Sequence, residues 1–250
     1  MNKFIILSII TTILISSCNT SIRKTTKDKI QTDTIYTNIN GKGIELLIDF
    51  EKGDKHNYPS FVFWLETTEG KFLQTLYITK SVATGVFGHG SDGDGKWKNE
   101  SGEAIRPASL PYWLHKRGIF SRDSLLVPTM EFPIADAYTG ATPKNNFVLL
   151  TKSDGDLNSK FVLLLEINQP WDWNEFWTND KYPDNSNYKT SCQPSLIYAV
   201  TIDLDSNEKE YYLNPIGHGH YAGENGRLYT DLSTITTALD IVKKIKVEVK

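Results

Sequence analysis

Apolar and polar residues alternate in several short stretches of the chain, which is typical of β-strands with one buried face. The first series covers residues 44–50, where Ile, Leu, Ile and Phe stand at every second position. Residues 60–66 and 72–79 repeat the pattern on either side of the Glu69-Gly70 turn, which predicts a hairpin over residues 60–79. Ordered structure is therefore expected to begin near Gly43.

The second half of the chain continues this pattern. Two apolar runs, 147–150 and 161–167, predict buried strands joined by a turn rich in Asp and Gly. Residues 195–204 alternate in polarity and are expected to pair with residues 208–213. A last strand is expected through residues 245–249.

Helical signals are sparse. Residues 107–118 begin around a proline and end at Gly118, which predicts one short helix, and residues 232–239 predict a second short helical piece. The sequence contains no glycine-rich strand-to-helix turn, no Gly-x-Ser-x-Gly elbow and no His-Glu-x-x-His helix. It therefore predicts an all-β fold for residues 41–250, a single immunoglobulin-like antiparallel β-sandwich with one or two short helices.

The beginning of the chain has the features of an export signal. A short basic segment precedes an apolar run, residues 4–15, that is too short to span a bilayer. The run leads into Ile15-Ser-Ser-Cys18, which resembles the lipobox of bacterial lipoproteins, where cleavage leaves an acylated cysteine. Residues 1–17 are interpreted as a signal peptide, and residues 18–40 as the lipidated Cys18 and a flexible polar tether. An ordinary secretory signal with a chance cysteine is the alternative.

The lipobox resemblance implies a lipid-anchored protein of the cell envelope. Because Asn19 is not an aspartate, the enterobacterial sorting rule implies the outer membrane, on its periplasmic or surface face. A formal net charge of −3 over 250 residues argues against nucleic acid as a partner and against a polybasic membrane patch. Apart from Cys18 the only cysteine is Cys192, which excludes an intrachain disulfide in the mature protein and favours a buried structural thiol over a reactive one.

The most specific motif is Asp136-Ala-Tyr-Thr139-Gly140-Ala141-Thr142. The pattern Asp-x-x-Thr-Gly-Ala-Thr resembles the target of the bacterial flavin transferase, which esterifies a threonine hydroxyl with the phosphate of FMN outside the cytoplasm. Thr142 would supply the attacking oxygen, Gly140 would permit unusual backbone angles, and Ala141 would add no bulk beside the acceptor. Asp136 and Thr139 would hold the turn by hydrogen bonds to nearby amides. The alternative is an exposed turn, closed by the following proline, with no chemistry.

Two further groups of residues are candidate binding sites. The loop Trp171–Trp177 holds four aromatic residues, which either stack on a flat ligand, an isoalloxazine ring or a sugar, or cover one open end of the sandwich. His89, His218 and His220 lie in Gly-His-Gly segments and would have to meet in space to hold zinc or copper. Two acidic stretches lack the glycine and the ligand pattern of a calcium loop and are interpreted as turns.

A basic pair ends the expected helix over residues 107–118. Lys116 and Arg117 either face an anion such as a flavin phosphate or form a solvated basic end that suits the helix dipole.

The order of four segments resembles the exported bacterial domain-of-unknown-function family 2271. These segments are YPSFVFWLETTEGKFLQTL, LPYWLHKRG, DAYTGAT and FVLLLEINQ. The resemblance extends over most of the chain after residue 40. It implies an immunoglobulin-like sandwich in an uncharacterised exported module, often encoded near flavin-transfer and membrane-reductase genes.

These observations lead to two main hypotheses. In the first, the lipoprotein is an electron carrier with FMN attached to Thr142; its partners are the membrane, through the lipid anchor, a flavin transferase and a membrane reductase. In the second, it is a binding or assembly module of the envelope without a cofactor, which uses the Trp171–Trp177 loop. Neither makes the protein an enzyme on its own. A histidine-dependent metal protein is a third option.

Overall fold

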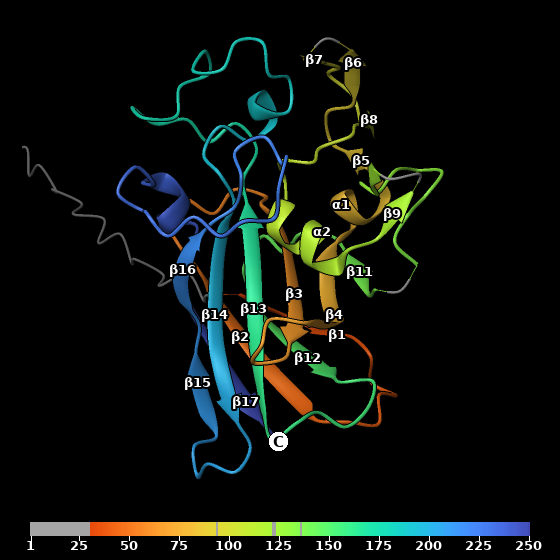
Figure 1. The fold of residues 1–250 in the computed structure, drawn as a ribbon, viewed down its shortest axis with the longest axis vertical. Helices are drawn as coiled ribbons and strands as arrows, with labels where there is room; N and C mark the ends of the chain where they lie inside the picture. The colour runs from red at the N-terminus through yellow and green to blue at the C-terminus, as the bar shows by residue number, and fades with distance from the viewer. Residues whose placement is uncertain (1–30, 94, 122–123, 136) are drawn as a thin grey trace, which may run out of the picture.

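The computed structural model describes residues 31–93, 95–121, 124–135 and 137–250. Two β-sheets pack against each other around an apolar core, which confirms the expected all-β sandwich (Figure 1). The predicted signal peptide 1–17, Cys18 and Asp136 lie outside the described residues.

Among the described residues, the first sheet runs in the order β1-β12-β2-β17-β15 and the second in the order β11-β4-β3-β13-β14-β16. The strands of the first sheet are β1 Thr32–Tyr36, β2 Glu45–Lys52, β12 Asn146–Lys152, β15 Glu210–Tyr212 and β17 Val242–Val249. The strands of the second sheet are β3 Ser60–Glu66, β4 Phe72–Thr79, β11 Thr139–Gly140, β13 Lys160–Asn168, β14 Leu196–Asp203 and β16 Asn214–His218.

Short elements fill the connections. Among the described residues, three two-stranded sheets pair β5 Val86–Phe87 with β8 Gly102–Glu103, β6 Ser91–Gly93 with β7 Lys96–Trp97, and β9 Phe120–Ser121 with β10 Ser124–Leu125. The helices are α1 Lys80–Thr84 and α2 Pro111–Arg117, with 3-10 turns at Tyr188–Thr190 and Thr237–Asp240. Within the described ranges, no helix is long and apolar enough to cross a membrane.

Both sheets are mixed, so the expectation of a purely antiparallel sandwich is corrected. β1 pairs in parallel with β12, and β11 pairs in parallel with β4, each at one edge of its sheet. β1 also lies inside the stretch 18–40 that the sequence assigned to a flexible tether. Alternation is present there, but the strand carries only Ile35 and Tyr36 as large apolar residues, too few to predict a strand from the pattern alone.

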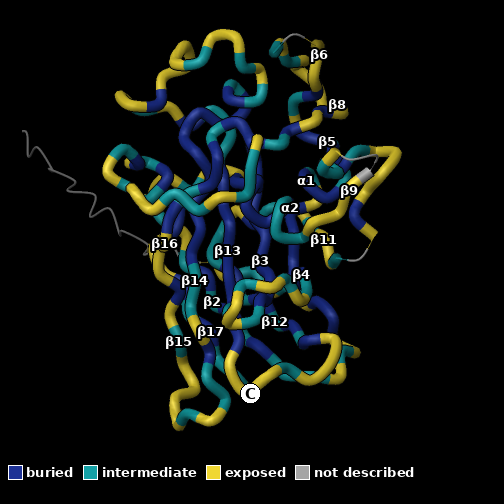
Figure 2. Tube along the Cα trace, viewed as in Figure 1, coloured by how far each residue is buried: buried dark blue, intermediate teal, exposed yellow. Residues whose placement is uncertain are grey.

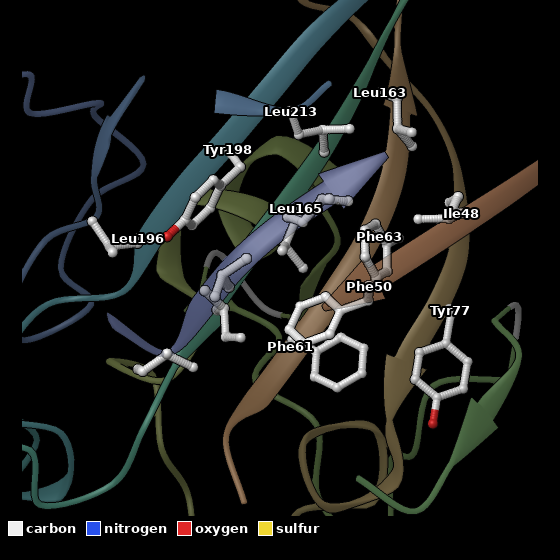
Figure 3. Packing of buried hydrophobic residues seen from close by; sticks show 14 of the residues in the cluster. Ile48, Phe50, Phe61, Phe63, Tyr77, Leu163, Leu165, Leu196, Tyr198 and Leu213 are labelled. Atoms are coloured by element: carbon white, nitrogen blue, oxygen red, sulfur yellow. The ribbon is translucent and has the colours of Figure 1, made fainter. Parts of the chain in front are cut away.

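Aromatic rings from both sheets form the centre of the core. Phe50 of β2 stacks on Phe147 of β12 with 4.6 Å between ring centroids, and Phe61 of β3 lies 5.5 Å from Phe147. Figure 3 shows Phe50, Phe61 and Phe63 projecting into the same space between the strands. Stacked and edge-to-face rings at such distances each add about 0.5–1.5 kcal/mol to the free energy gained from burial.

The central strands of the second sheet, β3 and β13, are mostly buried on both faces, and Figure 2 shows them in dark blue. On the face away from the first sheet, Val62 and Trp64 of β3 pack with Trp113 of α2 in a second apolar cluster. This explains why β3 is buried along its whole length instead of alternating.

A buried carboxylate fixes α2 on this face. Glu166 of β13 is completely buried and accepts hydrogen bonds from the backbone N–H groups of Tyr112 and Trp113, at 3.1 and 2.7 Å. The Ser195 hydroxyl donates a third hydrogen bond at 2.6 Å. The carboxylate thus satisfies donors in the first turn of α2 that have no partner within the helix.

Several predicted elements have the expected positions but different partners. The hairpin over residues 60–79, the helix ending at Gly118 and the last strand are confirmed as β3–β4, α2 and β17. The expected pairing of residues 195–204 with 208–213 is wrong, because β14 pairs with β13 and β16, whereas β15 joins β17 in the other sheet. The turn after β12 likewise leads across to the opposite sheet.

Candidate functional site

The motif lies at an edge of the second sheet, beside α1. Thr139 and Gly140 form β11, which pairs in parallel with the end of β4, and the N–H of Ile78 donates to the carbonyl of Tyr138 at 3.0 Å. Within the described residues no other strand pairs with β11. The motif is therefore held as a short edge strand rather than as a free turn, and its Thr139 and Ala141 are exposed.

Gly140 is required for a reason that the sequence did not reveal. Its φ is not in the left-handed region, so the expectation of unusual backbone angles is wrong. A Cβ at this position would instead lie 2.7 Å from the Tyr77 hydroxyl oxygen. That hydroxyl donates to the carbonyl of Ala141 at 3.0 Å, and burial raises the pKa of Tyr77 to about 12. The glycine thus lets a tyrosine support the backbone just before Thr142.

Thr142 follows this supported backbone and is half-buried. Its hydroxyl donates a hydrogen bond to the carbonyl of Pro59 at 3.1 Å. It also lines a cavity of about 450 Å³, a volume within the usual range for small-molecule sites. The other lining residues come from the start of β3 and the loop before it, from α1, from β5 and the loop after it, from the segment before α2, and from the loop after β13. They are Asn57, Tyr58, Ser60, Ser81, Phe87, Gly88, His89, Arg106, Pro170 and Trp171.

The contacts around this cavity fall into two groups, which we name the Thr142 end and the Arg106 end. At the Thr142 end, the ammonium group of Lys144 lies 5.3 Å from the centroid of the Tyr58 ring. At the other end, the rings of His89 and Trp171 lie 5.1 Å apart, and Arg106 donates to the carbonyl of His89 at 2.9 Å. In Figure 1, α1, β5 and β11 lie near one another beside the upper part of the second sheet.

Arg106 is a buried cation without a compensating anion. Its side chain is 5 % exposed, and its guanidinium group lies 4.1 Å from the ring centroid of Phe87 and 4.9 Å from that of Trp97. Its Nε–H is buried and has no hydrogen-bond partner, and no carboxylate among the described residues pairs with it. Burial lowers the pKa of Arg106 to about 10, so it stays charged at neutral pH.

A buried unpaired charge is costly, and proteins retain one chiefly where a ligand or reaction uses it. Composition and spacing give no sign of this role for Arg106, because only the fold brings β5, β7 and the segment before α2 around its guanidinium group. The sequence analysis therefore missed the residue. In the basic pair that ends α2, Lys116 faces an anion of the protein itself, since it donates to the Glu66 carboxylate at 3.3 Å and also to the carbonyl of Gly70 at 2.9 Å. Arg117 stacks on Trp113 at 5.6 Å.

The aromatic loop places its tryptophans in two kinds of position. Trp177 is buried against the core and covers one end of the sandwich. Trp171 lines the Thr142 cavity and also a second, open hollow of about 360 Å³ together with Trp97 and Trp173. Trp173 is half exposed. Trp171 has φ +57°, a conformation that non-glycine residues adopt only when the surroundings compensate for the strain.

The three histidines of the metal hypothesis do not form a cluster with one another. His89 lies in the Thr142 cavity, whereas His218 stacks on Tyr229 with 5.3 Å between centroids. His220 stacks on Tyr221 at 4.5 Å. Across the part of the chain that the structure describes, no three His, Cys, Asp or Glu side chains are arranged to hold a metal ion. Cys192 is buried and free, as expected, and burial raises the pKa of its thiol to about 12, so it is not a reactive thiolate.

Comparison of the chain with protein-family models, with curated proteins and with solved structures finds no match. The resemblance to the domain-of-unknown-function family 2271 therefore stays a prediction, and so does the immunoglobulin-like character of the sandwich.

Proposed function

We propose that this protein is an electron carrier of the cell envelope that holds FMN as a phosphate ester of Thr142. The observation that supports this most is that the motif threonine opens into a cavity with aromatic walls and one buried, unpaired guanidinium group. A flavin phosphate ester is large, flat and anionic. The cavity offers flat aromatic side chains, a positive charge and a donor without a partner, so the residues present fit the group.

The chain's own residues have separate tasks in this proposal. Thr142 would supply the oxygen that forms the new bond to phosphorus and would lose its hydroxyl proton. The donor would be a flavin dinucleotide, whose pyrophosphate bond breaks and releases a nucleoside monophosphate as the leaving group. Before the transfer, the hydroxyl must break its hydrogen bond to the carbonyl of Pro59, which costs on the order of 1 kcal/mol. Lys144, two residues later and exposed, stands where it can neutralise the phosphate. The bound flavin itself supplies the electron transfer.

The position of the motif favours modification by a separate enzyme. β11 is an edge strand, and the transferase has access to its outer side because Thr139 and Ala141 are exposed. Tyr77 holds the backbone just before Thr142 in one conformation through the Ala141 carbonyl. A fixed acceptor close to an accessible segment lowers the entropic cost of positioning it for transfer.

The proposal places the carrier at the membrane through Cys18, with the residues before Thr32 linking the lipid to the first strand. A membrane reductase would then deliver electrons to the attached flavin. Membrane anchoring of two partners raises their effective concentration, so a weak complex is sufficient for transfer.

The test is the intact mass of the protein after export from cells that also express a flavin transferase. We expect the mass of FMN less one water to be added to the wild type and to Thr142→Ser, which keeps the hydroxyl. We expect no addition to Thr142→Val, which has nearly the same shape. An unmodified wild type, recovered while the transferase modifies a known substrate, would overturn the proposal.

The second candidate is a non-enzymatic module that binds sugars. It rests on the hollow between Trp97, Trp171 and Trp173, where the exposed Trp173 and two partly buried indole rings offer faces on which sugar rings stack. Titration with soluble oligosaccharides should then quench tryptophan fluorescence, and Trp173→Ala should weaken binding whereas Thr142→Val should not. A protein that carries FMN and shows no saturable response to such sugars would exclude this candidate.

A further inference from the structure

We infer that the cavity beside Thr142 is a docking site for the isoalloxazine ring and that Arg106 is the residue in it that stabilises the reduced, anionic ring. The inference rests on the proposed attachment of FMN to Thr142 and assigns a redox-tuning role that the attachment alone does not require. Arg106 does not touch Thr142 in this structure, so it is a positioning and tuning residue rather than part of the attachment chemistry.

The first step is the separation of charges along the cavity. Lys144 follows Thr142 by two residues and lies beside Tyr58, which lines the cavity together with Thr142. Arg106 belongs to the other end, where it contacts Phe87, Trp97 and His89. An FMN group attached at Thr142 extends away from its phosphate through the ribityl chain, so its ring is the part that reaches the Arg106 end.

The second step is that three contacts hold the Arg106 guanidinium group in place. One terminal nitrogen is held by the His89 carbonyl at 2.9 Å, and two aromatic rings flank the guanidinium plane at 4.1 and 4.9 Å. Only 5 % of Arg106 is exposed, so water hardly hydrates its charge. Its Nε–H has no hydrogen-bond acceptor. The chain therefore maintains a preorganised positive charge with one free donor in a cavity large enough for a flat ligand.

The third step is the chemistry of the ring. A flavin held here would accept two electrons from its reductase and one proton from solvent, so reduction would add one negative charge to the ring. The fixed guanidinium group of Arg106 in the cavity would stabilise that charge more than it stabilises the neutral oxidised ring, and so it would raise the reduction potential. Because Arg106 stays protonated at neutral pH, its charge is present throughout the working range.

The fourth step is the aromatic wall. Trp171 lines the cavity and is held in a left-handed conformation with φ +57°, and its ring contacts those of His89 and Trp97. These contacts fix an indole at the Arg106 end, where a docked isoalloxazine ring would stack on it. Such stacking quenches flavin fluorescence, which gives a signal of docking that does not depend on electron transfer.

The experiment uses full-length exported protein whose attached FMN has been verified by intact mass. The midpoint potential is measured by spectroelectrochemistry in wild type, Arg106→Gln, Arg106→Lys and the matched control Lys144→Gln, which removes one positive charge from the phosphate end. We expect Arg106→Gln to weaken the preference for the reduced ring at least tenfold, a fall of about 30 mV for a two-electron couple. Arg106→Lys should retain most of the wild-type potential, and Lys144→Gln should change it less than Arg106→Gln.

Proton uptake separates a redox role from a structural one. Around neutral pH the wild-type potential should change with pH as expected for one proton taken up per two electrons. In Arg106→Gln the uptake should rise toward two protons, because the anionic ring has lost its partner. If Arg106→Gln only distorted the cavity, the flavin fluorescence would be less quenched, but the number of protons taken up would not change.

Flavin fluorescence tests the docking site with tryptophan variants, so this measurement does not depend on whether Arg106→Gln folds. The attached flavin should be quenched in wild type and in Trp173→Leu, whose indole lies outside this cavity, and should brighten severalfold in Trp171→Leu. Wild-type protein with the fluorescence of free FMN would overturn the docking site. Equal potentials and equal proton uptake in wild type and Arg106→Gln would overturn the role of Arg106. A mass without FMN would instead overturn the proposed function, and this inference with it.

Discussion

Two buried charges in this protein have opposite surroundings. Glu166 lies under α2, completely buried, and accepts three hydrogen bonds from Tyr112, Trp113 and Ser195. Arg106 lies beside the Thr142 cavity, almost as deeply buried, with an unpartnered Nε–H and no carboxylate nearby in the described part of the chain. The comparison shows how the same feature, a buried charge, has a structural explanation in one place and lacks one in the other.

The difference is in hydrogen-bond satisfaction. At Glu166 the donors come from the first turn of α2 and from a neighbouring strand, so the carboxylate connects elements that must stay together. At Arg106 the contacts are aromatic rings and one carbonyl, which position the guanidinium group without neutralising it. Buried polar groups in native proteins are usually satisfied, so the exception marks a candidate site.

The largest expected effect is the loss of stability in Glu166→Ala. Removing the carboxylate leaves two buried backbone N–H groups and one hydroxyl without their acceptor, and it creates a cavity under α2. We expect the free energy of unfolding in urea at pH 7 to fall by about 3 kcal/mol or more. Glu166→Gln, which keeps one carbonyl oxygen, should lose less. If Glu166→Ala costs less than about 1 kcal/mol, the carboxylate does not hold α2 in place.

The next effect is a pH dependence of the free energy of unfolding that is caused by Glu166. Burial raises its pKa from 4.5 to about 7, although the three hydrogen bonds partly oppose the shift. The folded protein then binds a proton more tightly than the unfolded chain, so the contribution is fully present below pH 4.5 and is lost as pH rises to about 7. At about 1.4 kcal/mol per pKa unit, the loss amounts to about 3 kcal/mol.

That pH dependence must be measured as a difference between wild type and Glu166→Gln. Burial lowers the pKa of His56 to about 4, which gives a contribution of opposite sign, since stability is lost as pH falls below the ordinary histidine pKa. His56 is unchanged in both proteins and therefore cancels. The free energies of unfolding of the two proteins, measured at several pH values, should converge as the pH rises toward 7. A difference that stays constant with pH would mean that the pKa of Glu166 is not raised in the folded protein.

The smallest expected effect is the change in stability of unmodified Arg106→Gln. The substitution removes one hydrogen bond and two cation–π contacts but also removes the cost of a buried unpaired charge. These terms are of similar size, so we expect the free energy of unfolding to stay within about 1 kcal/mol of wild type. A loss as large as that of Glu166→Ala would make Arg106 a structural residue and remove the contrast between the two charges.

Alternation of apolar and polar residues was sufficient to locate most strands, because a strand with one buried face has period two wherever it lies in a sheet. This alternation located the β3–β4 hairpin, β13 and β17. The end of α2 was located by Gly118, which follows the basic residues of the last helical turn. Alternation missed β1, whose residues are too polar to identify a strand. It also paired β14 with β15, because local pattern contains no information about which sheet a strand joins.

The sequence by itself determined the all-β class, most element positions and the motif around Thr142, since these depend on residues close together in the chain. Tertiary structure alone decided what surrounds that threonine. Gly140 is explained by the Tyr77 ring, Trp171 lines a cavity while Trp177 covers the core, and Arg106 is buried without a partner. Each of these facts depends on the distance between segments far apart in sequence, and burial and charge compensation are properties of that packing rather than of local pattern.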